Sequence, residues 1–412
     1  MRKGISIIFI TLIIGITVSQ LKPASDTTGT DPQYAGGSSR LAVLLGGRGI
    51  EGYTQAAGPR DFSFPQDHGP HRDFRNEWWY ITGNLDGERD ERFGFELTIF
   101  RFSLTPEQDH DRNASAWKTN QVYIGHFAIT DVVNESFHVA QRYARGSLGL
   151  AGAQAEPFQV WLEDWSIRCK NNNWQINASD KDMAIDLTLS PVKPLVLNGI
   201  DGLSQKSSEP GNASYYYSIP RLRTVGTLQI KDENYSVTGL SWLDHEWGSS
   251  GLSEEQQGWD WFALQLSDGS DLMFYSLRKI DGSRDPYSAG IWITADGQSM
   301  HLSDDDVDID VEDHWDSPLG GTYPSAWRLR IPQIDLDLRL RPVLDAQELR
   351  TTVRYWEGAV DVVGKKAGMP VEGRGYVELT GYAPRITVPV ELPPFFSNAH
   401  SRMSWRIQAL FY

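Results

Sequence analysis

The sequence predicts an all-β protein built from antiparallel sheets that close into barrels or sandwiches. Short runs rich in β-branched and aromatic residues recur along the chain, bounded by Gly, Asn and Asp, whereas sustained helical periodicity is hard to find. Several of these runs lie on either side of an Asp-Gly dipeptide, which supplies the positive φ that tight hairpins require. Strands that follow each other in sequence are therefore expected to pair, which favours meandering sheets over βαβ units.

The expected strands fall into two groups separated by the polar stretch SGLSEEQQG. They span 93–102, 122–132 and 236–245 in the first group, and 259–266, 272–277, 289–294, 336–344 and 374–382 in the second. Asp-Gly turns are expected at 86–87, 268–269, 281–282 and 296–297. A chain of 412 residues exceeds the usual size of one domain. We therefore place a domain boundary near residue 250, with halves of 61–250 and 251–412.

The N-terminus has the pattern of an export signal. Arg2 and Lys3 precede an apolar run from Ile5 to Val18, which small or polar residues follow near Ser19. This predicts a cleavable signal peptide over 1–19 and a periplasmic or secreted protein, with an uncleaved N-terminal membrane anchor as the alternative. Residues 20–60, rich in Gly, Ser, Thr and Pro, are expected to form a flexible linker.

Composition excludes several classes of function. The net charge of −16 argues against a nucleic-acid partner, which needs basic surface to neutralise phosphate. Cys169 is the only cysteine, so neither an internal disulfide nor a thiolate metal cluster is expected. No phosphate-binding loop, zinc motif or Gly-x-Ser-x-Gly elbow is found, and we expect no cofactor. The sequence leaves the oligomeric state open.

Three stretches combine aromatic residues with costly polar ones. The first is FPQDHGPHRDFRNEWWYITGNL, residues 64–85, and the second is LSWLDHEWGSSGL, residues 240–252, followed closely by GWDWFALQL. The third lies in YWEGAV at 355–360 and GRGYVELTGY at 373–382. Such density points to a binding site, because an exposed loop does not need the tryptophans and a core strand does not need the acids and histidines.

Strand alternation divides the second stretch between two faces. If residues 236–247 are extended, Leu243, His245 and Trp247 share one face, while Trp242, Asp244 and Glu246 share the other. An imidazole beside an indole on the inner face of a barrel would have a pKa open to tuning, as acid-base catalysis needs. By the same rule Asp260 points away from Trp259 and Trp261, and we expect it to support the first or the second stretch.

Two other interpretations stay open. Arg72, Arg75 and Asn76 could satisfy Asp67, Asp73 and Glu77 in a purely structural network between sheets. A metal site could be assembled from His68, His71 and His245, but no known ligand spacing supports it, and we assign no metal.

The stretches quoted above, together with GWDWFALQLSDG, resemble the secreted AttH-like proteins related to carotenoid 1,2-hydratases, whose members are often labelled predicted secreted hydrolases. The resemblance covers nearly all of the chain from residue 61 onward. It implies two lipocalin-like antiparallel β-barrels packed together, with the motif-rich strands lining a pocket near their junction. It also implies a hydrophobic partner, a lipid or an isoprenoid, and is compatible with peripheral membrane contact.

For function the resemblance implies an acid-base enzyme of the hydratase or hydrolase type, with a non-catalytic lipid carrier as the alternative. Hydration of an alkene needs a proton donor, and aromatic faces stabilise the resulting cation. The candidate acid-base residues are Asp67, His68, Asp244, His245, Glu246 and Asp260, and the candidate ligand-binding residues are His71, Glu77, Trp78, Trp79, Tyr80, Trp247, Trp259, Trp261 and Tyr376.

Overall fold

The structure, a computed structural model, describes residues 50–106, 115 and 118–383. The predicted signal peptide and residues 20–49 of the predicted linker lie outside the described residues. Contacts between residues group the described residues into one compact unit. The described end of the linker contacts the fold, because Thr54 N donates to Asp73 O at 3.0 Å and Ser249 Oγ donates to Thr54 O at 2.5 Å. No helix in the described part of the chain is long and apolar enough to cross a membrane.

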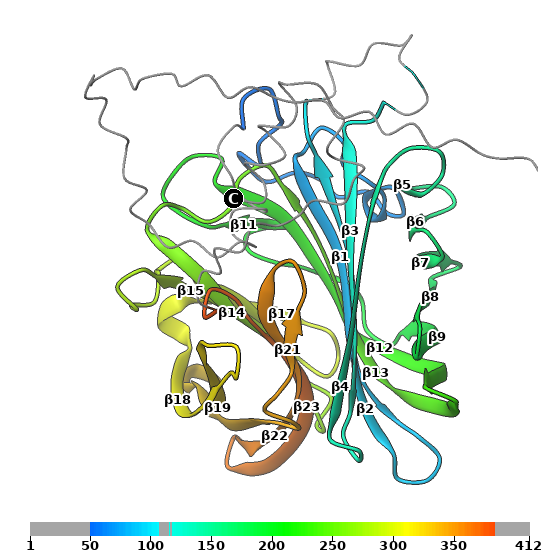
Figure 1. The fold of residues 1–412 in the computed structure, drawn as a ribbon. Helices are drawn as coiled ribbons and strands as arrows, with labels where there is room; N and C mark the ends of the chain where they lie inside the picture. The colour runs from blue at the N-terminus through cyan, green and yellow to red at the C-terminus, as the bar shows by residue number, and fades with distance from the viewer. Residues whose placement is uncertain (1–49, 107–114, 116–117, 384–412) are drawn as a thin grey trace, which may run out of the picture. The chain divides into compact units, whose positions relative to one another are not determined.

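The all-β prediction is confirmed, since nearly all regular structure in the described residues consists of antiparallel strands (Figure 1). The first sheet contains β1 (Asn76–Asp86), β2 (Arg92–Ser103), β3 (Gln121–Asp131), β4 (Ser136–Arg145), β5 (Ala151–Gln154), β6 (Gln159–Leu162), β7 (Trp165–Lys170), β8 (Asn173–Asp180), β9 (Met183–Pro191), β10 (Val196–Leu197), β11 (Leu203–Gln205), β12 (Ala213–Ile230) and β13 (Glu233–Gly248). The second contains β14 (Gln256–Leu266), β15 (Asp271–Lys279), β16 (Ala289–Ile293), β17 (Ser299–Ser303), β18 (Asp308–Asp316), β19 (Thr322–Ile331), β20 (Leu336–Pro342), β21 (Glu348–Arg350), β22 (Arg354–Lys366) and β23 (Met369–Leu379). Short 3₁₀ turns lie at η1 (Gln66–His68), η3 (Asp304–Asp306) and η4 (Pro332–Ile334).

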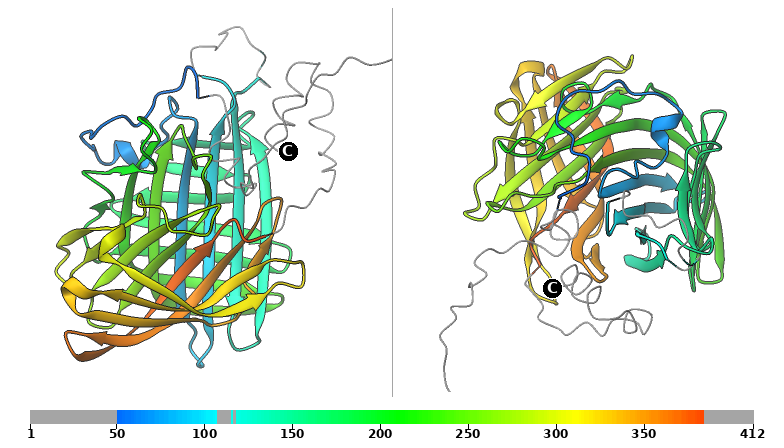
Figure 2. Two further views of the ribbon diagram at one scale, coloured as in Figure 1. Left: turned by 90° about the vertical axis from the view of Figure 1, so that its left-hand side faces the viewer. Right: turned by 90° about the horizontal axis from the view of Figure 1, so that it is seen from above.

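Both sheets curl, the first into a nearly closed barrel and the second into a half-barrel (Figure 2). The first has the order β4-β3-β2-β1-β13-β12-β9-β8-β7-β6-β5, and contacts of β4 with β6 bring its two ends together. The second has the order β17-β16-β15-β14-β23-β22-β20-β19-β18. One sheet ends at Gly248 and the other begins at Gln256, while the two-domain division stays a prediction.

The Asp-Gly turns behave as expected at three positions and differently at one. Gly269, Gly282 and Gly297 have φ values of 85°, 84° and 87°, the left-handed region that glycine enters without steric cost. Between β1 and β2 the residue with positive φ is Asp90, at 63°, in place of Gly87. This connection is therefore a longer loop in which an aspartate, which tolerates left-handed backbone, makes the turn.

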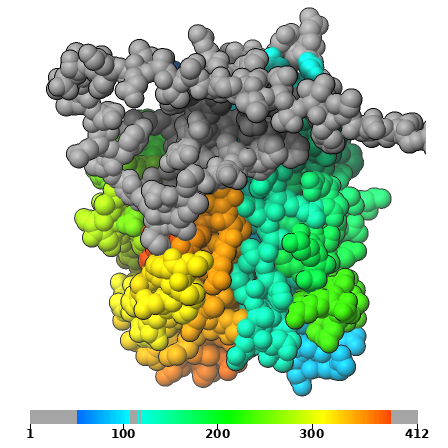
Figure 3. Space-filling view, viewed as in Figure 1, coloured from blue at the N-terminus to red at the C-terminus, as the bar shows by residue number. Residues whose placement is uncertain are grey.

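Three layers of buried side chains result from strand alternation. One layer fills the first barrel and contains Trp79 and Trp247, which both contact the ring of His245. A second layer fills the half-barrel around Phe262 and Trp327. The third lies between the outward faces of the two sheets, and we call it the sheet junction. On the face drawn in Figure 3, residues near 350 adjoin residues of β3 and β4, in agreement with the hydrogen bond from Thr352 Oγ1 to Gln141 Oε1 at 2.8 Å.

Candidate functional site

The first two polar-aromatic stretches meet, because β1 and β13 are antiparallel neighbours. Trp79 lies opposite His245 and Tyr80 opposite Asp244 in the strand register. Alternation then sends their side chains to opposite sides of the sheet, as the sequence predicts for β13. The predicted site residues therefore divide into two clusters, one inside the first barrel and one in the sheet junction.

Inside the first barrel lies a hydrogen-bonded group that we call the barrel cluster: Asp67, His68, His71, Glu77, Arg101 and His245. Its centre is the fully buried Glu77, on β1. Glu77 Oε1 lies 2.8 Å from His71 Nδ1 and 3.0 Å from His245 Nε2, and Arg101 Nε donates to Glu77 Oε2 at 2.6 Å. His71 Nε2 lies 3.0 Å from Asp67 Oδ1, and Asp67 in turn accepts from Arg60 Nη2 at 2.8 Å. The acids thus take Arg60 and Arg101 as partners, two arginines that the sequence analysis did not single out.

Electrostatics hold the two acids of the barrel cluster in their charged form. Burial raises the pKa of Glu77, but Arg101 and the two imidazoles outweigh burial and keep this pKa well below its usual range. The pKa of Asp67 is likewise lowered, because bonds from His71 and the Ser63 amide and the charge of Arg60 outweigh burial. A paired buried carboxylate of this kind accepts hydrogen bonds and does not supply a proton.

The pKa values of the three histidines of the barrel cluster are shifted in different directions. Burial lowers the pKa of His71, but the hydrogen bonds to Asp67 and Glu77 raise it by more than burial lowers it. The pKa of His71 is therefore above its usual value. Burial lowers the pKa of His245 despite Glu77, and it lowers the pKa of His68 to about 3. His68 Nδ1 lies 2.6 Å from the Tyr217 hydroxyl.

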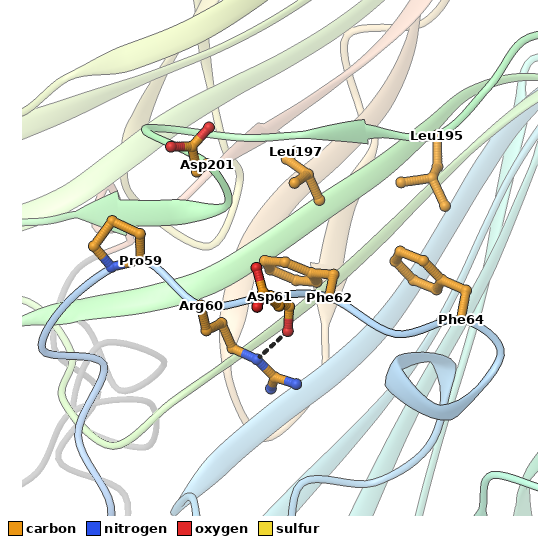
Figure 4. A pocket seen from close by; sticks show the side chains of 8 residues that line it. All are labelled: Pro59, Arg60, Asp61, Phe62, Phe64, Leu195, Leu197 and Asp201. Atoms are coloured by element: carbon orange, nitrogen blue, oxygen red, sulfur yellow. Dashed lines mark hydrogen bonds between the residues drawn. The ribbon is translucent and has the colours of Figure 1, made fainter.

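A cavity of about 650 Å³ lies beside this cluster, at the first described residues of the chain. Figure 4 shows Phe62 and Phe64 across from Leu195 and Leu197, with Arg60 at the edge. Phe62 and Phe64 also contact residues further in, since Phe62 packs on Trp247 and Phe64 on His68. These rings separate the cavity from the barrel cluster, and Arg60 lines the cavity while it also donates to Asp67 of the cluster.

The sheet junction contains a second polar group, which we call the junction cluster: Tyr80, Glu96, Glu357 and Tyr376. Each member is at least nine-tenths buried. The Tyr80 hydroxyl donates to Glu357 Oε2 at 2.8 Å, and Thr98 Oγ1 donates to Glu96 Oε1. Glu96 Oε2 and Glu357 Oε1 have no hydrogen-bond partner among the described residues. Buried polar atoms are rarely left unpaired, so two from one cluster mark a place for water or a polar ligand group.

The pKa values of both carboxyls of the junction cluster are raised, which favours their protonated forms. Burial raises the pKa of Glu96 to about 8 and the pKa of Glu357 well above its usual range, and the charges of Glu378 and Glu96 raise that of Glu357 further. No lysine or arginine of the described residues pairs with either acid. Burial also raises the pKa of the neighbouring Glu378 to about 8. The junction thus presents neutral carboxylic acids, which can donate a proton at neutral pH.

Asp244 and Glu246 also line the sheet junction, both on β13. Unlike Glu96 and Glu357, they have several hydrogen-bond or ion-pair partners. Asp244 accepts from Tyr216, Ser218 and Trp242, of which Trp242 Nε1 donates at 2.6 Å. Burial raises the pKa of Asp244 to about 7, although these three donors lower it. Glu246 is paired with Lys206 at 3.0 Å. Trp261 Nε1 donates to the Tyr216 hydroxyl at 3.1 Å and ties this group to the second sheet.

The predicted residues are placed as follows. The barrel interior holds Asp67, His68, His71, Glu77, Trp79, His245 and Trp247, and the junction holds Trp78, Tyr80, Asp244, Glu246, Trp259, Trp261 and Tyr376. Asp260 joins neither cluster. It pairs with Arg278 at 2.9 Å and accepts from the Tyr382 hydroxyl at 3.0 Å, so it does not support the first or second stretch as expected.

Sequence reasoning missed Arg101, Glu96 and Glu357 as site residues. Their signal is a single charged residue inside an otherwise apolar strand: Glu96 and Arg101 in FGFELTIFRF, and Glu357 in YWEGAV. A strand buried on both faces has no solvent to receive such a residue, so each must find a partner or lose its charge.

Together these features define an all-β protein of two barrel-like sheets with acids gathered at their junction. The sequence matches the profile of the AttH-like family over residues 55–382, and the chain belongs to that family. It is 34% identical to an AttH protein of Nitrosomonas europaea, whose crystal structure superimposes with a TM-score of 0.71 over 79% of this chain and 100% of that one. Kievitone hydratase of Nectria haematococca shares the fold at 15% identity, with a TM-score of 0.60 over 80% of this chain and 96% of that one. No curated protein matches the sequence significantly.

Proposed function

We propose that this protein is an acid-base enzyme of the hydratase type, which adds water across a carbon-carbon double bond of a hydrophobic substrate at the junction cluster. The observation that carries the proposal is the pair of fully buried acids Glu96 and Glu357, each with one oxygen that no described group engages; burial raises the pKa of both. A protonated acid with a free oxygen in an apolar layer is the group that alkene protonation requires.

The chemistry balances with these residues alone. The hydroxyl proton of a carboxylic acid, Glu357 or Glu96, passes to one alkene carbon, and the π electrons form the new C–H bond. The neighbouring carbon becomes a cation, and the acid becomes a carboxylate, which the Tyr80 hydroxyl stabilises when the donor is Glu357. Water then bonds to the cation and returns a proton to the carboxylate, so the enzyme is regenerated.

The surroundings suit a hydrophobic, unsaturated substrate. The apolar side of the junction contains Trp261, Met273 and Ile291, and aromatic faces stabilise a cation without trapping it. Trp78, Trp259 and Glu378 are only half-buried. We propose that a substrate enters the junction past these three residues. Kievitone hydratase carries a hydratase activity in its name on the same fold, which supports this reaction class as an analogy.

Isotope incorporation tests the proposal. The purified protein is incubated in H₂¹⁸O with isoprenoid alkenes and unsaturated fatty acids, and products are examined by mass spectrometry for one added ¹⁸O. We expect Glu96→Gln and Glu357→Gln to bind the probe while turnover falls, by about 10²- to 10⁴-fold for the residue that transfers the proton. Glu312→Gln, at an exposed acid on β18, is the matched control. Wild-type turnover in both junction variants would contradict acid catalysis at this cluster.

A carrier function has its own supporting observation, the cavity at the barrel mouth. Phe62, Phe64, Leu195 and Leu197 line it, and such surfaces suit an acyl or isoprenoid chain. Native mass spectrometry of the purified protein, followed by lipid extraction, distinguishes the two functions. A stoichiometric copurifying lipid, with no ¹⁸O product from any probe, would select the carrier. A protein that copurifies without lipid and hydrates a probe would select the enzyme.

We also propose that the protein is exported, because the basic start and the apolar run from Ile5 to Val18 have the pattern of a signal peptide. Mass determination of the N-terminus of protein made in its native host tests this. Cleavage near Ser19 supports release into the periplasm or medium, and an intact N-terminus in the membrane fraction supports an anchor.

A further inference from the structure

We propose that His71, Glu77 and His245 form a binding site for a divalent first-row transition-metal ion such as Zn²⁺. The inference does not rest on the proposed function, because these residues lie inside the first barrel and the proposed catalytic acids lie in the sheet junction. His71 Nδ1, His245 Nε2 and a carboxylate oxygen of Glu77 all lie within 4.8 Å of one another. Two imidazoles and one carboxylate are a ligand set that zinc and iron sites use.

The distances between the donor atoms suit a shared ion. Glu77 Oε1 is 2.8 Å from His71 Nδ1 and 3.0 Å from His245 Nε2. Ligand atoms about 2.0–2.2 Å from a zinc ion lie roughly 3–3.5 Å apart, so a small outward shift of these side chains makes room for the ion. Glu77 and His245 are fully buried, and the His71 side chain is only 12% exposed, so the three donor groups are almost enclosed.

Each candidate ligand also has a second polar contact that orients it, as metal ligands usually do. A ligating histidine typically donates its other ring N–H to a carboxylate or a backbone carbonyl. Here His71 Nε2 lies 3.0 Å from Asp67 Oδ1, and His245 Nδ1 lies 3.1 Å from the Asp67 carbonyl oxygen. Arg101 Nε fixes the second oxygen of Glu77 at 2.6 Å. One residue, Asp67, therefore orients both imidazoles toward the same carboxylate.

The ring nitrogens of His71 and His245 can be satisfied either by an ion or by hydrogen bonds alone. All four nitrogens of His71 and His245 face oxygen atoms, so pairing every one with those oxygens would need two imidazolium ions whose ring centroids are 5.7 Å apart. With a metal ion bound, both rings can be neutral. Each ring then donates its one N–H to an oxygen of Asp67, and its other nitrogen coordinates the ion through its lone pair. The competing arrangement has no metal. In it His68 donates to Tyr217 and the Tyr217 hydroxyl, 3.2 Å from His245 Nδ1, donates to that nitrogen.

The ion would join three parts of the chain. His71 belongs to the segment that precedes β1, Glu77 to β1 itself, and His245 to β13. Segment 60–74 contacts the barrel through His71 stacked on Trp247, with ring centroids 3.7 Å apart at an angle of 3°. Metal binding in the folded state alone would stabilise this attachment by mass action.

Metal titration of the full protein, purified without a polyhistidine tag and stripped with a chelator, tests the site. We expect one Zn²⁺ per chain by calorimetry and elemental analysis, a Co²⁺ visible spectrum of low coordination number, and a Tm that rises with Zn²⁺. His71→Ala and His245→Ala should lose stoichiometric binding, and Asp67→Asn should weaken it about 10- to 100-fold while leaving the ligands in place. His138→Ala, on β4, is the control and should bind as the wild type does.

Two results would overturn the site. One is a folded wild-type protein that binds neither Zn²⁺, Co²⁺, Mn²⁺ nor Fe²⁺ stoichiometrically, which selects the hydrogen-bonded arrangement through Tyr217. The other is unchanged stoichiometric binding in both His71→Ala and His245→Ala. Because the wild-type titration alone decides the first result, the test holds even if a variant fails to fold.

Discussion

The Tyr80 hydroxyl donates a hydrogen bond to Glu357 Oε2 at 2.8 Å, across the sheet junction and 277 residues apart in sequence. Tyr80→Phe removes the one donor that this acid has among the described residues. Leaving a buried acceptor unpaired costs about 1–3 kcal/mol of unfolding free energy. Urea denaturation measures this loss, and hydration assays should show reduced turnover. Tyr143→Phe, at a tyrosine that is 46% exposed, is the control and should change stability by about 0.5 kcal/mol or less. Equal effects of the two substitutions would contradict a role for the cross-sheet bond.

Glu96 should make the free energy of unfolding decrease as pH rises, because its pKa is raised in the fold. Its pKa is about 8 in the fold and 4.5 as an ordinary glutamate. Both states are protonated below pH 4.5, so the fold bears no cost there. Between these values the unfolded chain releases the proton and the folded chain retains it, so stability decreases by about 1.4 kcal/mol per pH unit from this group.

Glu96→Gln should therefore flatten the pH dependence of stability. Gln cannot ionise and still accepts from Thr98 through its amide oxygen. The unfolding free energy of the variant, relative to that of the wild type, should increase from pH 5 to pH 8. The increase should be at most about 5 kcal/mol at pH 8 and should stay constant at higher pH. Urea unfolding at several pH values measures the two slopes. Parallel slopes would show that Glu96 is ionised in the fold.

The ion pair of Glu77 with Arg101 should dominate local stability, because both side chains are fully buried. Arg101→Met leaves a charged carboxylate without its cation and should cost about 3–5 kcal/mol. The double variant Glu77→Gln/Arg101→Met should recover part of this loss, since no charge stays buried there. Arg328→Met breaks the partly exposed Arg328–Asp337 pair, 2.7 Å long, and should cost far less, because water screens this pair. Equal losses of stability in Arg101→Met and Arg328→Met would contradict a larger contribution from the buried pair.

Acid should also weaken the barrel cluster. The pKa of Glu77 is lowered in the fold, so its contribution to stability is present above the unfolded value and is lost as pH falls through the folded value. This direction is opposite to that of Glu96. In Glu77→Gln the acid limb of the stability profile should become shallower, which denaturation at low pH measures.

Gly94 on β2 lets the two sheets approach. A Cβ atom at this position would lie 2.7 Å from Cβ of Ala359 on β22. Gly94→Val should therefore overpack the junction and cost about 1–3 kcal/mol. Adding Ala359→Gly should return part of that loss in a double-mutant cycle. Gly58→Ala, where nothing lies within 4 Å of the new atom, is the control. Full additivity of the two substitutions would contradict direct contact between the sheets here.

The fold class and the family can be predicted from local patterns in the sequence. Alternating β-branched and aromatic runs specify strands locally, and the Asp-Gly dipeptides specify turns, so both are visible without knowing what packs where. Alternation also assigned His245 and Trp247 to one face of β13 and Asp244 to the other, because the side-chain period of a strand is a local property. The long motifs of residues 64–85 and 240–252 were enough to indicate the AttH-like family.

Which residues share a site depends on strand pairing and on packing between distant segments. Strand pairing brought residues 64–85 against residues 240–252 but divided their side chains between a barrel interior and a sheet junction. The partners Arg60 and Arg101, and the separation of Asp260 from both clusters, depend on contacts far apart in sequence. So does the protonation of Glu96 and Glu357, because desolvation is set by what covers a carboxyl. The cover over these two acids is the opposite sheet, which no local pattern describes.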